Sequence, residues 1–105
     1  MKKIQRYHLP ECENIIELPV GSSVLSVANQ DNSICLFAAI NPEGKTEKRC
    51  FTVAFCGDKL EFNLSENPYL GNVFDENGFS RHVFENKQRM REIKRKENPV
   101  VILPG

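Results

Sequence analysis

The sequence lacks any segment of the kind that crosses or enters a membrane. No stretch approaches the roughly 18 consecutive apolar residues that a transmembrane helix requires. The N-terminal segment MKKIQRYHLP has two lysines but no apolar run after them, so it does not resemble a secretory signal peptide. We therefore expect no membrane association and a location in the cytosol.

Close cysteine pairs are also missing. The chain has 4 cysteines, at positions 12, 35, 50 and 56, and none forms the C-x₂₋₄-C pair with which one loop aims two ligands at a zinc ion. Cys50 and Cys56 share a strand face in the expected pattern, but they would lie on the order of 20 Å apart along an extended strand. In a reducing cytosol all of these residues are expected to remain thiols. We predict no metal site and no cofactor.

The common signatures of catalysis and nucleotide binding are absent, including G-x-S-x-G, the P-loop, H-E-x-x-H and the dinucleotide fingerprint. A nucleophilic enzyme needs a thiol or hydroxyl that a base activates. His82 could supply the base, and the nucleophile could then be Cys35, Cys50 or Cys56, but the linear sequence does not show that these side chains meet. We favour a strand histidine that bonds a neighbour or faces water, and we predict no enzymatic activity.

The sequence does contain strand-like alternation. Its 105 residues are 40% hydrophobic and 27% charged, which is typical of one globular domain. In RCFTVAFC, Phe51, Val53 and Phe55 point one way and the residues between them the other. Residues 34–40 (ICLFAAI) fit a central strand covered on both faces, and residues 59–64 (KLEFNL) alternate again. Further strand candidates are QRYHLP, NIIELP, SVLSV, YLGNVF and FSRHVF.

Turn-forming residues separate these strands. NQDNS joins Val27 to Ile34, NPEGK follows Ile40, and DENG joins Phe74 to Phe79. Each segment contains the Asn, Asp, Pro or Gly that tight turns need, and strands joined by such turns lie antiparallel. The sequence therefore predicts an all-β fold, a small antiparallel β-sandwich or barrel built largely as a meander of about seven strands.

Residues 86–105 differ from the rest of the chain in charge. They hold 6 Lys and Arg against 2 Glu, whereas residues 1–85 hold 8 Lys and Arg against 12 Asp and Glu. ENKQRMREIKRKEN has good helix formers and no Gly or Pro before Pro99, so it predicts a short basic helix or arm. PVVILPG then predicts a terminal apolar strand between two prolines. We divide the chain into a β domain, residues 1–85, and a basic C-terminal extension, residues 86–105.

Several segments of the β domain form a recognisable set. They are Tyr7-His8-Leu9, IELPVGSSVLSV with Gln30 after it, LFAAINP, Arg49 with Phe51 and Val53, YLGNV, and GFSRHVFE. The set resembles a family of small bacteriophage-encoded proteins classed as a domain of unknown function; it covers residues 7 to 85, and ELPVGSSVLSV and HVFE are its most specific parts. The resemblance implies a phage or prophage origin and an all-β domain, with no assigned activity and no functional residue. Phe37 departs from the family, which often has Trp there, and the residues after Glu85 exceed its usual short form.

We expect the protein to act by binding a phage or host protein in the host cytosol, as an accessory factor that modulates host machinery or defence. A second copy of the chain is a further possible partner, and PVVILPG could add a strand to the protein's own sheet, to that copy or to another protein. The predicted contact residues are Arg89, Arg91, Lys94, Arg95, Lys96, Val100, Val101, Ile102 and Leu103. Nucleic-acid binding is the alternative, and it would use the basic residues Lys87, Arg89, Arg91, Lys94, Arg95 and Lys96. It would weaken steeply with salt, but the segment lacks the aromatic residues on which bases stack.

Overall fold

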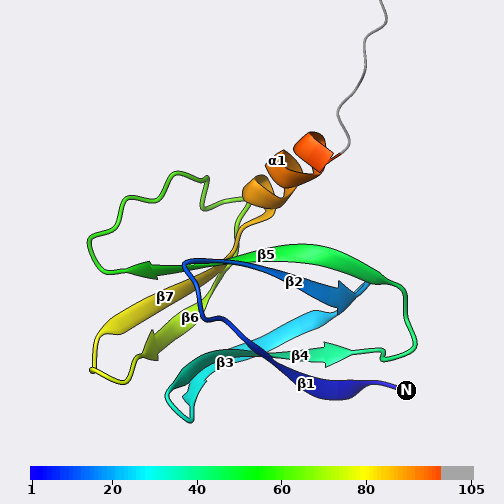
Figure 1. Cartoon of the computed structure of the whole chain (residues 1–105), viewed down its shortest axis with the longest axis horizontal. Coiled ribbons are helices and arrows are strands. Elements are labelled where there is room, and N and C mark those ends of the chain that lie inside the picture. The colour runs from blue at the N-terminus through cyan, green and yellow to red at the C-terminus, as the bar shows by residue number, and fades with distance from the viewer. Residues whose placement is uncertain (98–105) are drawn as a thin grey trace, which may run out of the picture.

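Seven β-strands form two antiparallel sheets that pack face to face, and a C-terminal helix lies outside them (Figure 1). The computed structural model describes residues 1–97. The elements are β1 (Lys3–His8), β2 (Glu13–Pro19), β3 (Ser23–Gln30), β4 (Ser33–Ile40), β5 (Thr46–Phe55), β6 (Tyr69–Phe74), β7 (Ser80–Glu85) and α1 (Lys87–Glu97). The predicted antiparallel β-sandwich is confirmed. Within the described residues no helix has the length and apolar character that crossing a membrane requires.

The order of the strands differs from the predicted meander. The two sheets have the orders β1-β4-β3 and β2-β5-β7-β6. Among the described strands, only β3–β4 and β6–β7 are hairpins of consecutive strands, and NPEGK carries the chain from β4 in one sheet to β5 in the other. Turn residues mark where the chain changes direction but not which sheet the next strand joins. Each sheet must cover the apolar face of the other, and the chain achieves this by crossing between the two layers.

The β3–β4 hairpin has the short turn that NQDNS predicts. Asp31 and Asn32 have φ values of 54° and 62°, and they lie between the paired residues Gln30 and Ser33. A two-residue turn of this kind matches the twist of the flanking strands, and Asn and Asp tolerate the left-handed conformation that it requires.

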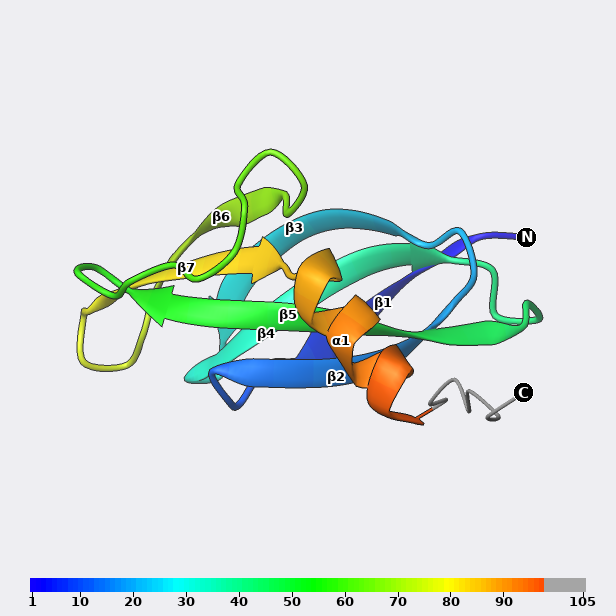
Figure 2. The same ribbon diagram turned by 90° about the horizontal axis from the view of Figure 1, so that it is seen from above.

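Alternation along the strands sends one set of side chains into the space between the sheets. On β5, Phe51 and Val53 are buried in this core, whereas Cys50, Thr52 and Ala54 belong to the opposite, outward set. The core consists of Leu9, Leu18, Leu36, Ala38, Ile40, Phe51, Val53, Val73 and Val83. Helix α1 lies across β5 on the outer side of the four-stranded sheet (Figure 2), so the outward residues of β5 form the surface on which it packs.

The edge strands β3 and β6 bring the two sheets together at one side of the sandwich. There the Asn29 side-chain amide donates to the Phe74 carbonyl at 2.9 Å. Gly71 on β6 has a φ of 148° and lies where the β6–β7 register shifts. A β-carbon at this position would lie 2.9 Å from Cγ2 of Val27 on β3. The close approach of the two strands therefore requires glycine.

The segment KLEFNL is not a strand, contrary to the prediction from its alternation. It lies in the connection between β5 and β6, where Leu60 and Leu64 are exposed and the Phe62 ring packs edge-on against Phe84 at 5.2 Å. The Asn67 side-chain amide donates to the Asn63 carbonyl at 2.6 Å. Local bonds of this kind between side chain and backbone compete with strand pairing.

Candidate functional site

Helix α1 begins at a cap that ties it to the four-stranded sheet. The Asn86 side-chain oxygen accepts the Arg89 N–H at 2.9 Å, and the Asn67 side-chain oxygen accepts the Gln88 N–H at 3.1 Å. These N–H groups of the first turn have no partner within the helix itself. The Asn86 amide also donates to the Thr52 hydroxyl on β5 at 3.0 Å. The start of the helix is thereby fixed over β5.

The helix covers part of the outward face of β5. Cys50 is 1% exposed and Met90 is 6% exposed, although neither belongs to the core between the sheets. Burial raises the pKa of the Cys50 thiol to about 11, and the Glu13 carboxylate adds to the rise. Cys50 is therefore a neutral packing residue at neutral pH.

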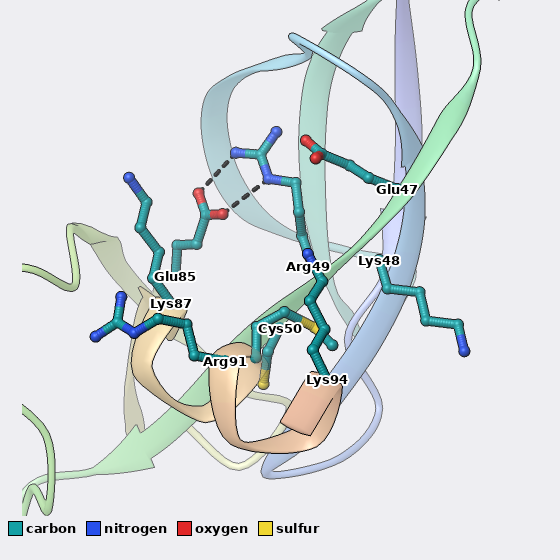
Figure 3. Close-up of a pocket in the computed structure, with 9 residues that line it drawn as sticks. Glu47, Lys48, Arg49, Cys50, Glu85, Lys87, Arg91 and Lys94 are labelled. Carbon is teal, nitrogen blue, oxygen red and sulfur yellow. Dashed lines mark hydrogen bonds and ion pairs between the residues drawn. The ribbon is translucent and has the colours of Figure 1, made fainter. Parts of the chain in front are cut away.

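Beside Met90, the helix and the sheet leave a cavity of about 320 Å³ that we call the basic groove (Figure 3). Three of its cations, Lys87, Arg91 and Lys94, are spaced i, i+4, i+7 and therefore occupy one face of α1. A fourth, Lys48, comes from β5. The full lining consists of Glu47, Lys48, Arg49, Cys50, Glu85, Lys87, Met90, Arg91 and Lys94.

A largely buried ion pair joins β5 to β7 at the groove. The Arg49 guanidinium donates to both carboxylate oxygens of Glu85, at 2.8 and 2.6 Å (Figure 3), and to the Ser22 carbonyl at 2.7 Å. The hydrogen bond to Glu85 raises the pKa of Arg49 above its ordinary value, while burial acts in the opposite direction. Because these two charges are matched within the protein, the pair shapes the groove and leaves little charge for a ligand.

Two of the groove cations have partners on the protein surface. Arg91 pairs with Glu66 at 3.0 Å, and Lys48 pairs with Glu97 at 3.3 Å. All four side chains are at least 44% exposed, and such surface pairs contribute only about 0–1 kcal/mol each. A carboxylate or phosphate from a ligand can therefore compete with Glu66 and Glu97 for the groove cations.

The residues predicted from the sequence divide into those in the groove and those outside it. Arg91 and Lys94 line the groove, whereas Arg95 and Lys96 are exposed in the last turn of α1 without lining it. The predicted strand-pairing residues Val100, Val101, Ile102 and Leu103 lie outside the described residues.

Arg89 lies on another side of the helix. Its guanidinium pairs with Glu13 on β2 at 2.6 Å and with Glu92 at 3.3 Å, and the hydrogen bond to Glu13 raises its pKa. It lines a different cavity, of about 440 Å³, together with both glutamates. Arg89 therefore holds the helix against β2 and does not contribute to the basic groove.

The prediction from the sequence did not place Lys48 or Arg49 in the site, and it named Lys87 only for the nucleic-acid alternative. The spacing of Lys87 to Arg91 and Lys94 could have placed it with them on one helix face. The alternation of β5 puts Lys48 on the same outward face as Cys50, which is also visible in the sequence. The sequence does not show that this face lies beneath α1. Within residues 1–97, no group of three or more His, Cys, Asp or Glu side chains is placed to hold a metal ion.

Comparison with known proteins identifies a family but no activity. A family model described as Domain of unknown function (DUF7352) matches residues 1–94. The chain belongs to this family. No curated protein and no solved structure matches the chain. The DUF7352 match extends past the residues 7 to 85 that carry the resemblance in the sequence, and it includes Lys87, Arg91 and Lys94 of the basic groove.

Proposed function

We propose that the main activity of this protein is binding, and that its basic groove holds an acidic segment of a partner protein. The observation that carries the proposal is the meeting of three cations on one face of α1 with Lys48 of β5 around one cavity. Carboxylates of the partner would lie among these cations, and an apolar side chain beside them would contact Met90.

The ion pairs of the groove cations are weak enough for a partner's carboxylates to replace them. The bonds from Arg91 to Glu66 and from Lys48 to Glu97 join well-exposed side chains, so breaking them costs little. The buried pair between Arg49 and Glu85 remains intact and keeps β5 and β7 together beneath the bound segment. A partner carboxylate would therefore meet a preformed site, which lowers the entropy cost of binding.

The distribution of charge favours a protein over a nucleic acid. Residues 1–85 carry an excess of acidic side chains, which would repel a long polyanion that extends beyond the groove. The helix sequence KQRMREIKRKE has no aromatic residue for base stacking. Nucleic acid remains the second candidate because the last turn adds Arg95 and Lys96 beside Lys94. The logarithm of the affinity for a nucleic acid would fall linearly with the logarithm of the salt concentration.

We also propose that the partner is a host or phage protein and that the complex forms in the cytosol of an infected cell. The resemblance of residues 7 to 85 to phage-encoded proteins supports this setting. In it the protein would act as an accessory factor that modulates host machinery or defence. A second copy of the chain is the remaining partner class.

The test compares two variants with the same change in net charge. One carries Lys87→Glu, Arg91→Glu and Lys94→Glu in the groove. The control carries Lys2→Glu, Lys3→Glu and Arg6→Glu in and beside β1, on the opposite sheet. Fluorescence anisotropy measures the binding of a labelled polyglutamate peptide and of a labelled single-stranded DNA to each protein.

The groove variant should lose at least about tenfold in affinity for the peptide, while the control variant keeps the affinity of the original protein. DNA should bind more weakly than the peptide. Equal loss in both variants would assign binding to net charge and contradict the groove. Tighter DNA binding that depends on the groove cations and on salt would favour the second candidate.

A further inference from the structure

The outer face of the four-stranded sheet carries a second group of polar side chains, outside the basic groove. His82 on β7 pairs in register with Ala54 on β5, and Cys56 follows two residues later in the chain. The Cys56 Sγ lies 3.2 Å from His82 Nε2. The Tyr69 hydroxyl lies 2.8 Å from His82 Nδ1. We call these three side chains the thiol–imidazole cluster.

Each nitrogen of the His82 ring has its own contact, and its role as donor or acceptor follows from the tautomer. When Nδ1 carries the proton, it donates to the Tyr69 oxygen, and the lone pair on Nε2 is left to accept the proton of the Cys56 thiol. The Ser80 hydroxyl is also near Nε2, at 3.5 Å, but it donates to the Asn72 side chain. The arrangement contains a nucleophile, a base within hydrogen-bond reach and a third group that orients the base.

The other cysteines lack this combination of access and base. Cys50 is buried beneath α1, and burial raises its pKa to about 11. Cys35 lies 3.7 Å from His8 Nδ1 but is fully buried. Cys12 is exposed, and no histidine nitrogen in residues 1–97 lies within hydrogen-bond distance of its sulfur. In the described part of the chain, Cys56 alone is both exposed and paired with an imidazole.

We propose that Cys56 is the nucleophile of a thiol–disulfide exchange site that takes the disulfide of a low-molecular-weight thiol, with His82 as its base. His82 Nε2 accepts the thiol proton, and the Cys56 thiolate attacks one sulfur of the disulfide. A new S–S bond forms at Cys56 as the old one breaks, and the departing thiolate takes the proton back from His82. One disulfide and one thiol are consumed, and one mixed disulfide and one thiol are produced, so no further oxidant is required.

The experiment treats the full chain with glutathione disulfide near neutral pH and follows each cysteine by peptide mass spectrometry. Cys12 is the internal control, since it is exposed without a base. Cys56 should form the mixed disulfide about tenfold faster than Cys12, because His82 Nε2 lies 3.2 Å from its sulfur and can accept the thiol proton as the sulfur attacks. His82→Gln should remove most of this advantage and leave the rate at Cys12 unchanged.

Tyr69→Phe tests the positioning role of the hydroxyl, because it keeps the aromatic ring that packs on Phe84 at 5.2 Å. It should lower the rate at Cys56 in the original chain and have no effect in a His82→Gln chain, where the hydroxyl has no base to orient. A purely structural hydroxyl would change the rate equally in both chains. Circular dichroism checks that each variant folds. Equal rates at Cys56 and Cys12 in the original chain, or a rate at Cys56 that His82→Gln does not change, would overturn the proposal.

Discussion

At the scale of single residues, Gly71 shows how one position sets the distance between two sheets. Its φ of 148° lies in a region that side chains rarely adopt, and a β-carbon would meet Val27 Cγ2 at 2.9 Å. Gly71→Ala should therefore combine backbone strain with overpacking and lower the free energy of unfolding by about 2–4 kcal/mol. Urea denaturation of the two proteins measures the difference.

Gly21 provides the matched control for this substitution. It also has a positive φ, 80°, but nothing lies within 4 Å of the position that its β-carbon would take. Gly21→Ala should cost only the backbone strain, about 1–2 kcal/mol. If both alanine variants lose the same stability, the contact with Val27 does not contribute to the cost and the β3–β6 edge adjusts to the added methyl group.

At the scale of elements, α1 makes the stability of the protein depend on the protonation of Cys50. The folded state holds the thiol proton more tightly than the unfolded chain, because burial raises the pKa from 9.0 to about 11. The stability that the protonated thiol contributes is therefore fully present below its pKa in the unfolded chain. It is lost as the pH rises through its pKa in the folded state. The free energy of unfolding should fall between about pH 9 and about pH 11.

A Cys50→Ala chain separates this titration from that of other groups. It should be less stable than the original chain at neutral pH, by about 1 kcal/mol for the lost packing. The difference between the two chains should shrink as the pH rises, since only the original chain has a buried thiol to ionise. Urea denaturation of both chains across the pH range measures this difference in free energy of unfolding. If the two free energies change in parallel with pH, Cys50 does not ionise from a buried state.

The elements that the sequence predicts well are those fixed by local chemistry. Alternation in RCFTVAFC correctly separates Phe51 and Val53 from the outward residues, and Asp31 with Asn32 forms the expected turn. Alternation in KLEFNL misleads, because a strand also needs a neighbour to accept its hydrogen bonds and the sequence does not name one. The crossing from β4 to β5 is missed for the same reason.

The candidate sites also combine local features, which the sequence predicts, with contacts between distant residues, which it does not. The spacing of Lys87, Arg91 and Lys94 is a local property of a helix and can be read from the sequence. The approach of Cys56 to His82 depends on the register of β5 with β7, and the approach of Lys48 to the helix depends on the packing of α1 on β5. Both join residues far apart in the chain, and no single segment specifies either of them.

At the scale of the whole molecule, the basic helix and the acidic body are not separate. Arg89 pairs with Glu13 of β2, and Arg91 pairs with Glu66 of the β5–β6 connection. The helix also covers Cys50 and takes its N-terminal cap from Asn86 and the loop before β6. These contacts indicate that α1 is integral to the folded unit that precedes it.

Shortened chains test where the folded unit ends and what the last residues do. A chain of residues 1–86 should lose at least about 2 kcal/mol relative to a chain of residues 1–97, because Met90 no longer covers the sheet. Light scattering on the full chain and on residues 1–97 then tests the strand pairing predicted for residues 100–103. If that segment joins two copies, the full chain has the mass of a dimer and the shortened chain that of a folded monomer. Equal masses would exclude pairing between copies through this segment and leave it to the protein's own sheet or to another partner.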